Sequence, residues 1–127
     1  MTHHEHVTTD HVEYASKDPA ATRRFLENVF GFKFDVVEAM GGYAMRSGQL
    51  ARGSGTGVRK LEPSEPPATI AYLTVLNIDD SLKSAQKEGA RVVLPKTEIP
   101  GFGWHAVVHA PGDLPIGIFQ ANMTAQP

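Results

Sequence analysis

A proline-rich segment divides this chain into two halves that repeat the same order of predicted elements. Residues 61–67 contain three prolines, and proline cannot donate a backbone hydrogen bond inside a helix or a central strand. On either side, alternating apolar and polar residues predict strands, and a 3.6-residue apolar period predicts one helix. We therefore expect two βαβββ modules, at about 9–60 and 69–121, joined by a linker at 61–68.

The first half contains the helix with the clearest predicted boundaries, at 19–30. Asp18 can accept a hydrogen bond from an unpaired N–H, and Pro19 suits the first helical position. Gly31 supplies a left-handed stop. The apolar face of this helix is formed by Phe25, Leu26, Val29 and Phe30. Strands are predicted before it at 10–16 and after it at 32–38, 43–47 and 49–60.

The second half repeats this plan with a strand at 70–76, a helix from Ile78 to Gly89, and strands at 91–94, 104–109 and 116–120. Shifting the sequence by 59 residues places Asp18 on Asn77 and His11 on Ile70 without a gap. This correspondence indicates an internal duplication. The alternative is an ordinary α+β domain whose symmetry is coincidental.

Composition excludes several classes of function. The chain has 12 basic and 14 acidic residues, so it lacks the excess of positive charge that binds nucleic acid or an anionic membrane. The chain has no cysteine, and therefore no disulfide, thiol nucleophile or cysteine-bound metal. The longest apolar stretch, residues 70–78, is far too short to span a membrane, and the N-terminus lacks a secretory pattern. We expect a soluble, cytoplasmic protein.

Several short motifs resemble the vicinal oxygen chelate (VOC) superfamily, which includes glyoxalase I, bleomycin-resistance proteins and extradiol dioxygenases. In the first half they are His11-Val12-Glu13-Tyr14, Asp18-Pro19 and Val29-Phe30-Gly31-Phe32; in the second half they are Pro100-Gly101-Phe102-Gly103-Trp104 and Gly117-Ile118-Phe119-Gln120. The resemblance implies a single domain over 1–127, with an α+β fold in which both modules form a curled-sheet cradle. This is the glyoxalase/bleomycin-resistance fold.

The resemblance also implies where a catalytic metal ion would be held, on the first and fourth strands of each module. His11 matches the first of these positions, but Ile70 and Gly117 occupy two others and bring no donor atom. The fourth strand offers Gly55, Thr56, Gly57 and Val58, none of which is a carboxylate. Because a divalent metal normally needs three or more protein ligands, we expect no metal and no other cofactor.

The candidate ligand-binding residues are His11, Glu13, Tyr72, Phe102 and Trp104. His11 and Glu13 lie on the same side of their predicted strand, where they could orient a ligand or move a proton. Tyr72 could offer its ring and hydroxyl, and Phe102 and Trp104 lie in a glycine-bounded segment. The alternative to a ligand-binding role is a structural one: His11 could be a hydrogen-bonded structural histidine, and Phe102 and Trp104 could pack in the core.

Two further histidines and a glycine-rich segment carry alternative interpretations. His105 and His109 share one side of a strand, where solvent exposure is the simpler interpretation, although either could join His11 in an unconventional metal site. Gly53–Gly57 resembles a phosphate-binding loop, but no helix follows it. We interpret these glycines as a strand that allows close approach of a ligand or of the other module.

The leading hypothesis is a protein of the bleomycin-resistance kind that binds a small, partly hydrophobic molecule without a complete metal site. The alternative is a metal-dependent lyase, isomerase or dioxygenase related to glyoxalase I, with an unconventional site. Open sheet edges and the VOC resemblance further predict a homodimer.

Overall fold

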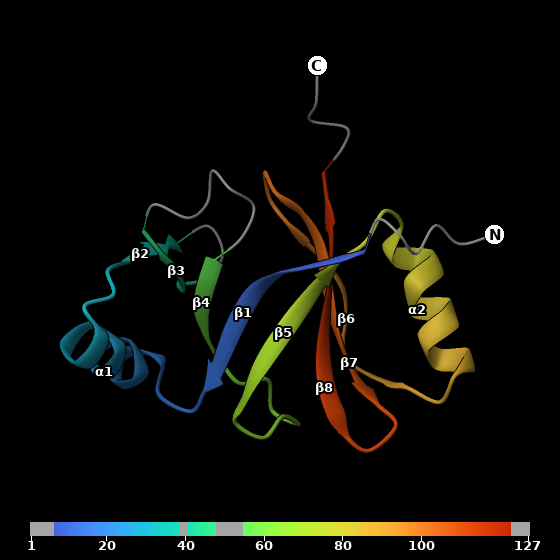
Figure 1. The fold of residues 1–127 in the computed structure, drawn as a ribbon, viewed down its shortest axis with the longest axis horizontal. Helices are drawn as coiled ribbons and strands as arrows, with labels where there is room; N and C mark the ends of the chain where they lie inside the picture. Colours follow the sequence, from blue (N-terminus) through green and yellow to red (C-terminus); the bar gives the residue numbers. More distant parts are fainter. Residues whose placement is uncertain (1–6, 39–40, 48–54, 123–127) are drawn as a thin grey trace. The chain divides into compact units, whose positions relative to one another are not determined.

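The computed structural model describes residues 7–38, 41–47 and 55–122. Its elements are β1 (Thr8–Ser16), α1 (Pro19–Phe30), β2 (Phe34–Val37), β3 (Tyr43–Arg46), β4 (Gly55–Lys60), β5 (Ala68–Thr74), α2 (Ile78–Lys87), β6 (Arg91–Ile99), β7 (Gly103–Ala110) and β8 (Leu114–Ala121) (Figure 1). The order βαβββ occurs twice, which confirms the predicted α+β fold.

The chain forms two compact units, which we call the first unit (Asp10–Ile70) and the second unit (Ala71–Pro127 with Met1–Thr9). In the first unit the strand order is β2-β3-β4-β1, with β1 and β4 parallel and the other pairs antiparallel. In the second unit the order is β5-β8-β7-β6, with β5 and β8 parallel and the others antiparallel. This identical topology supports the predicted duplication.

The two helices begin at equivalent caps. The Asp18 side chain accepts a hydrogen bond from the Ala21 amide at 3.1 Å, and the Asn77 side chain accepts one from the Asp80 amide at 3.0 Å. Each bond satisfies one of the amides that a helix N-terminus leaves unpaired. At the end of α1, Gly31 has a φ of 74°, the left-handed conformation expected there. The sequence therefore predicted α1 with its ends, and it placed the start of α2 correctly.

Each unit has its own apolar cluster. In the first unit it contains Leu26, Ala44 and Val58, with Tyr14, Phe32 and Phe34 packed against it. In the second unit it contains Ile78, Ala106, Val108 and Ile118. Ala106 and Val108 reach this cluster from the same side of β7. Neither α1 nor α2 could cross a membrane, and the described part of the chain has no other helix that could.

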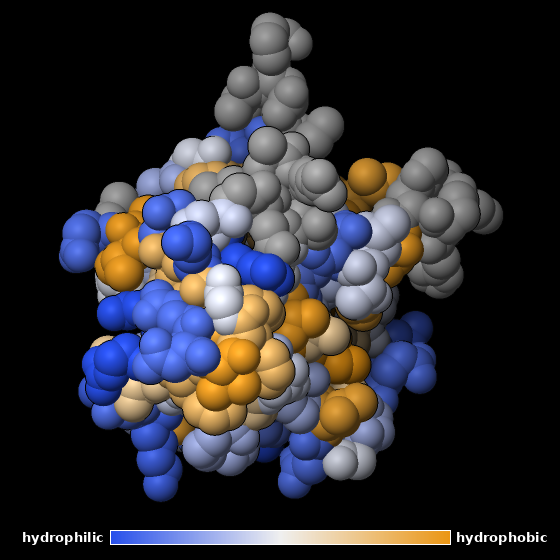
Figure 2. Space-filling model, turned by 60° about the vertical axis from the view of Figure 1, so that its left-hand side comes forward, coloured by the Kyte–Doolittle hydropathy of each residue, from blue (hydrophilic) through white to orange (hydrophobic). Residues whose placement is uncertain are grey.

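The apolar face of α1 is less buried than its pattern predicts. Leu26 is buried, but Phe25, Val29 and Phe30 are 58%, 56% and 61% exposed. The ring of Phe30 lies 6.2 Å from those of Phe25 and Phe32, so the aromatic side chains pack on one another at the surface. Figure 2 turns the side that carries α1 toward the viewer, where hydrophobic residues lie beside hydrophilic ones.

Strand β6 is longer than expected, because the sequence predicts an end at Leu94 and the strand continues to Ile99. It passes through Pro95, which is tolerated because β6 is the last strand of its sheet and its register with β7 shifts on both sides of Leu94. In the first unit, residues 49–54 of the predicted strand 49–60 lie outside the described residues, and residues 55–60 form β4.

Candidate functional site

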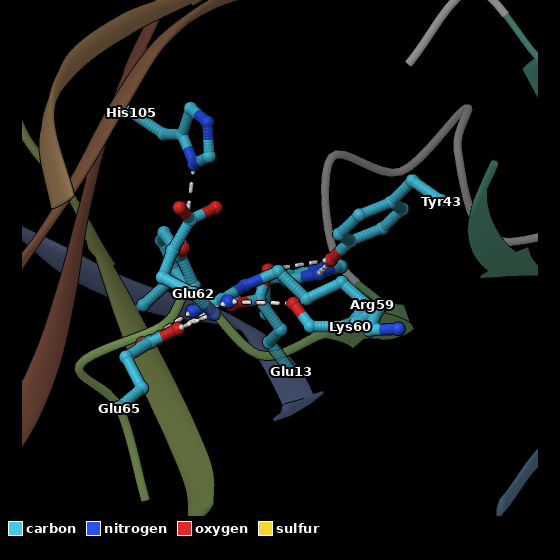
Figure 3. A network of polar contacts seen from close by, with 9 residues as sticks. Glu13, Tyr43, Arg59, Lys60, Glu62, Glu65 and His105 are labelled. Carbon is cyan, nitrogen blue, oxygen red and sulfur yellow. Dashed lines mark hydrogen bonds and ion pairs between the residues drawn. The ribbon is translucent and has the colours of Figure 1, made fainter. Parts of the chain in front are cut away.

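Glu13 is a buried carboxylate at the centre of a polar network in the first unit (Figure 3). It lies in the middle of β1, where strand alternation places it on the side of His11, and it pairs in register with Gly57 of β4. Only 1% of the residue is exposed. A buried charge is stable only when it is paired and hydrogen-bonded, so the neighbours of Glu13 decide what this site can do.

Arg59 and Glu65 supply the charges around Glu13. The Arg59 Nε donates to Glu13 Oε2 at 2.6 Å, and its Nη1 and Nη2 donate to the two oxygens of Glu65 at 2.7 and 2.8 Å. Glu65 belongs to the proline-rich linker, where its carboxylate also accepts from the Glu62 amide at 2.8 Å. A bidentate pair of this kind holds both side chains in a fixed geometry. The linker is therefore anchored to the strand that carries Arg59.

Tyr43 completes the network from the neighbouring strand β3. Its hydroxyl donates to Glu13 Oε1 at 2.9 Å and lies 2.9 Å from His11 Nε2. The tyrosine fits because Gly57 has no side chain, and a Cβ at this position would overlap the tyrosine ring and hydroxyl. At Gly57, the close approach that the sequence predicts is made by a side chain of the same unit.

His11 is the half-buried member of this network. Burial lowers the pKa of the imidazole below its ordinary value of 6.5, and the nearby Glu13 carboxylate raises it, but burial has the larger effect. The imidazole is therefore neutral at pH 7. A neutral imidazole has one nitrogen that donates a hydrogen bond and one that accepts, so it can serve as a base or as a hydrogen-bond acceptor.

The lowered pKa of His11 predicts a loss of stability in mild acid. Below about pH 6.5 the unfolded chain binds a proton at His11 more readily than the folded chain does, so the free energy of unfolding should fall as the pH falls. Urea denaturation between pH 7.5 and 5 measures this, with an upper limit of about 1.4 kcal/mol per pH unit for one proton. His11→Gln should show a shallower pH dependence than the parent. An identical dependence in both proteins would contradict the prediction.

The second unit places Tyr72 beside His105. The Tyr72 hydroxyl lies 3.4 Å from His105 Nδ1, and the two rings are stacked with centroids 6.3 Å apart. Tyr72 pairs in register with Gly117, where a Cβ would overlap the tyrosine ring. Each unit therefore sets a glycine of its fourth strand against a tyrosine ring, Gly57 with Tyr43 and Gly117 with Tyr72.

Trp104 lies on the other side of β7 from His105. It packs against the apolar cluster beside α2, and Lys96 lies over its ring at 5.4 Å. The structure therefore does not bring Trp104 onto the side of Tyr72, because neighbouring residues of a strand point to opposite sides. Phe102, in the turn before β7, is 39% exposed.

The prediction of solvent exposure is wrong for His109, which is 8% exposed. Its Nδ1 lies 3.2 Å from Arg91 Nη2 and 3.9 Å from Asp113 Oδ1. A metal ion bound to this nitrogen would lie close to the positively charged guanidinium of Arg91, and the two cations would repel each other. His109 is thus a structural histidine with charged neighbours.

At the positions that the VOC resemblance assigns to a metal ion, the described residues bring one imidazole, that of His11, and no carboxylate. Over the described residues, no group of three or more His, Cys, Asp or Glu side chains could hold one. Glu13 already has a cationic partner in Arg59, and a metal ion there would face like charge. The rings of Tyr43 and Tyr72 lie against the two fourth-strand glycines.

Sequence reasoning found His11 and Glu13 but missed Tyr43, Arg59 and Glu65. One signal for Arg59 was present: in the alternation of the fourth strand it shares a side with Gly57, the partner of Glu13. Nothing comparable marks Tyr43 or Glu65, because their contacts depend on packing between separate segments.

The sequence matches the family model of the Glyoxalase/Bleomycin resistance protein/Dioxygenase superfamily over residues 8–114. The chain belongs to this superfamily. Over 122 residues it is 25% identical to CFP32 of Mycobacterium tuberculosis, which is provisionally named a glyoxylase. That alignment covers 91% of this chain and 46% of CFP32, so the chain spans about half the length of this relative.

Solved structures of other proteins share the glyoxalase fold. A hypothetical protein of Bacillus halodurans superposes with a TM-score of 0.62 at 12% identity, covering 92% of this chain and 96% of that one. A methylmalonyl-CoA epimerase of Streptomyces coelicolor superposes with a TM-score of 0.56 at 18% identity, covering 90% and 96%. At these identities the likeness concerns the fold alone, because one fold hosts many activities.

Proposed function

We propose that this glyoxalase-superfamily chain binds a small, partly hydrophobic molecule without a metal ion, with His11 as the contact residue of the polar network. One observation carries the proposal: Arg59 donates to Glu13 at 2.6 Å, so the cation that balances this buried carboxylate is part of the chain. Tyr43 and Arg59 together hold Glu13 in a single position. A rigid polar group of this kind suits orientation of a ligand, which is how small-molecule sites obtain specificity.

Thermal-shift screening with flat, partly hydrophobic compounds tests the proposal. Compounds that bind the folded protein raise its melting temperature, and the rise should be smaller in His11→Ala. Tyr14→Phe is the matched control, because Tyr14 packs against the apolar cluster of the first unit. Equal shifts in all variants would show that the ligand binds elsewhere.

The rival function is that of a metal-dependent lyase, isomerase or dioxygenase with an unconventional site that includes His105 or His109. Elemental analysis of untagged protein purified without chelator separates the two. We expect well under one zinc, nickel, iron or manganese ion per chain. A value near one that is lost in His11→Ala would overturn our proposal and favour the enzyme. Homodimer formation and a cytoplasmic location stay predictions.

A further inference from the structure

The exposed face of α1 carries a continuous row of aromatic rings. Successive ring centroids lie 6.1 to 6.2 Å apart along the row, which runs through Phe25, Phe30, Phe32 and Phe34. Phe25, Val29 and Phe30 are each more than half exposed. With about 200 Å² for an aromatic side chain, these three residues present roughly 300 Å² of apolar surface to solvent. A contiguous apolar patch of this size is often functional in a soluble protein.

The second unit provides an internal comparison for this face. At the positions of the three exposed α1 side chains, the shift of 59 residues that relates the two halves places Ser84, Glu88 and Gly89. All three are exposed, and polar or small residues are the ones expected on the solvent side of a helix. The duplicated fold therefore does not require apolar residues at these positions. Their presence in α1 needs a cause outside the packing of the first unit.

A depression lies at one end of the aromatic row, where the chain leaves α1 and enters β2. It has a volume of about 440 Å³ and is lined by Phe32 and Phe34 together with Glu27, Gly31 and Lys33. The exposed ring of Phe25 lies at the other end of the row. The same face thus offers both an exposed ring and a depression lined by aromatic rings. A surface of this kind is complementary to itself, which is what a two-fold interface requires.

From these observations we infer that the aromatic face of α1 is the interface of a homodimer, in which Phe25 of each copy lies over the depression of the other. A standard interface covers about 800 Å² per copy, of which about 56–65% is apolar. The three exposed side chains supply more than half of that apolar area. Glu27 and Lys33 leave the depression without net charge, so it does not repel a second copy. The inference goes beyond the proposed function and places the predicted dimer contact on α1, not at the open sheet edges.

Sedimentation velocity at protein concentrations up to about 100 μM tests the inference. We expect a dimer in the parent protein. The double variant Phe25→Ser with Val29→Glu introduces the residues that the second unit has at these positions, and it should raise the dissociation constant at least about a hundredfold. Leu76→Ser is the matched control, because Leu76 is 60% exposed and lies in the second unit. A monomeric parent, or a dimer weakened no more by the double variant than by Leu76→Ser, would overturn the inference.

Cross-linking tests the same contact even if the double variant fails to fold. The chain contains no cysteine, so Val29→Cys introduces its only thiol. Val29 lies one turn after Phe25 and just before the segment that lines the depression, so it lies near the inferred two-fold axis. Oxidation should join most of the Val29→Cys chains into covalent dimers, whereas Leu76→Cys should remain largely single chains. If both variants cross-link to the same extent, the inference is wrong. Neither measurement involves His11, so the proposed ligand binding is tested separately.

Discussion

Replacing Arg59 with methionine is expected to lower the free energy of unfolding by about 3–5 kcal/mol, the usual cost of removing one partner from a buried ion pair. Methionine keeps much of the side-chain volume but leaves Glu13 and Glu65 without the donor that both share. Their side chains are only 2% and 3% exposed, so water cannot replace the guanidinium. Urea denaturation at pH 7.5 measures the loss.

Arg23 provides a matched control for this substitution. It forms an ion pair with Glu27 on the surface of α1 at 4.0 Å, and pairs of this kind contribute about 0.3–0.5 kcal/mol. Arg23→Met should therefore be nearly neutral. Combining Arg59→Met with Glu13→Gln and Glu65→Gln should recover part of the stability, because no uncompensated charge remains. If Arg59→Met lowers the free energy of unfolding no more than Arg23→Met does, Arg59 does not stabilise the buried carboxylates as we infer.

Gly117→Ala is expected to destabilise the protein by about 1–3 kcal/mol, the range typical of overpacking. The added methyl group would overlap the ring of Tyr72, which is 4% exposed and has little room to move. In an ordinary strand the same change is favourable by about 0.5–1 kcal/mol, because glycine loses more backbone freedom on folding. The sign of the effect therefore reports the contact with Tyr72.

A double-mutant cycle separates these two contributions. Tyr72→Ala removes the ring, and in that background Gly117→Ala should be neutral or stabilising. The cycle is followed by chemical denaturation of the parent, both single variants and the double variant. If the alanine at position 117 costs as much without the ring as with it, the contact is not the reason for the glycine.

The fold could be predicted from the sequence because its signals are local. Asp18, Pro19 and Gly31 define the ends of α1 by rules that involve only neighbouring residues. The repeated order of elements was visible for the same reason. Local signals failed where burial depends on what lies opposite: Phe25 and Phe30 have helical spacing, yet each is more than half exposed.

The polar network could be predicted only in part. His11 and Glu13 lie on one strand, so alternation alone placed them on the same side. Arg59 reaches Glu13 from β4, Glu65 reaches Arg59 because the linker turns back against β4, and Tyr43 reaches Glu13 from β3 over Gly57. These contacts depend on how segments far apart in sequence pack, which propensity and periodicity do not encode.

The close fit between Tyr43 and Gly57 also limits how this sequence can evolve. A carboxylate introduced at position 57 would overlap the tyrosine, so this change is harmful while Tyr43 is present. Losing Tyr43 first would deprive Glu13 of a hydrogen-bond donor before any new ligand exists. The two positions are thus epistatic: each substitution is unfavourable alone, and only their combination makes room for a metal ligand.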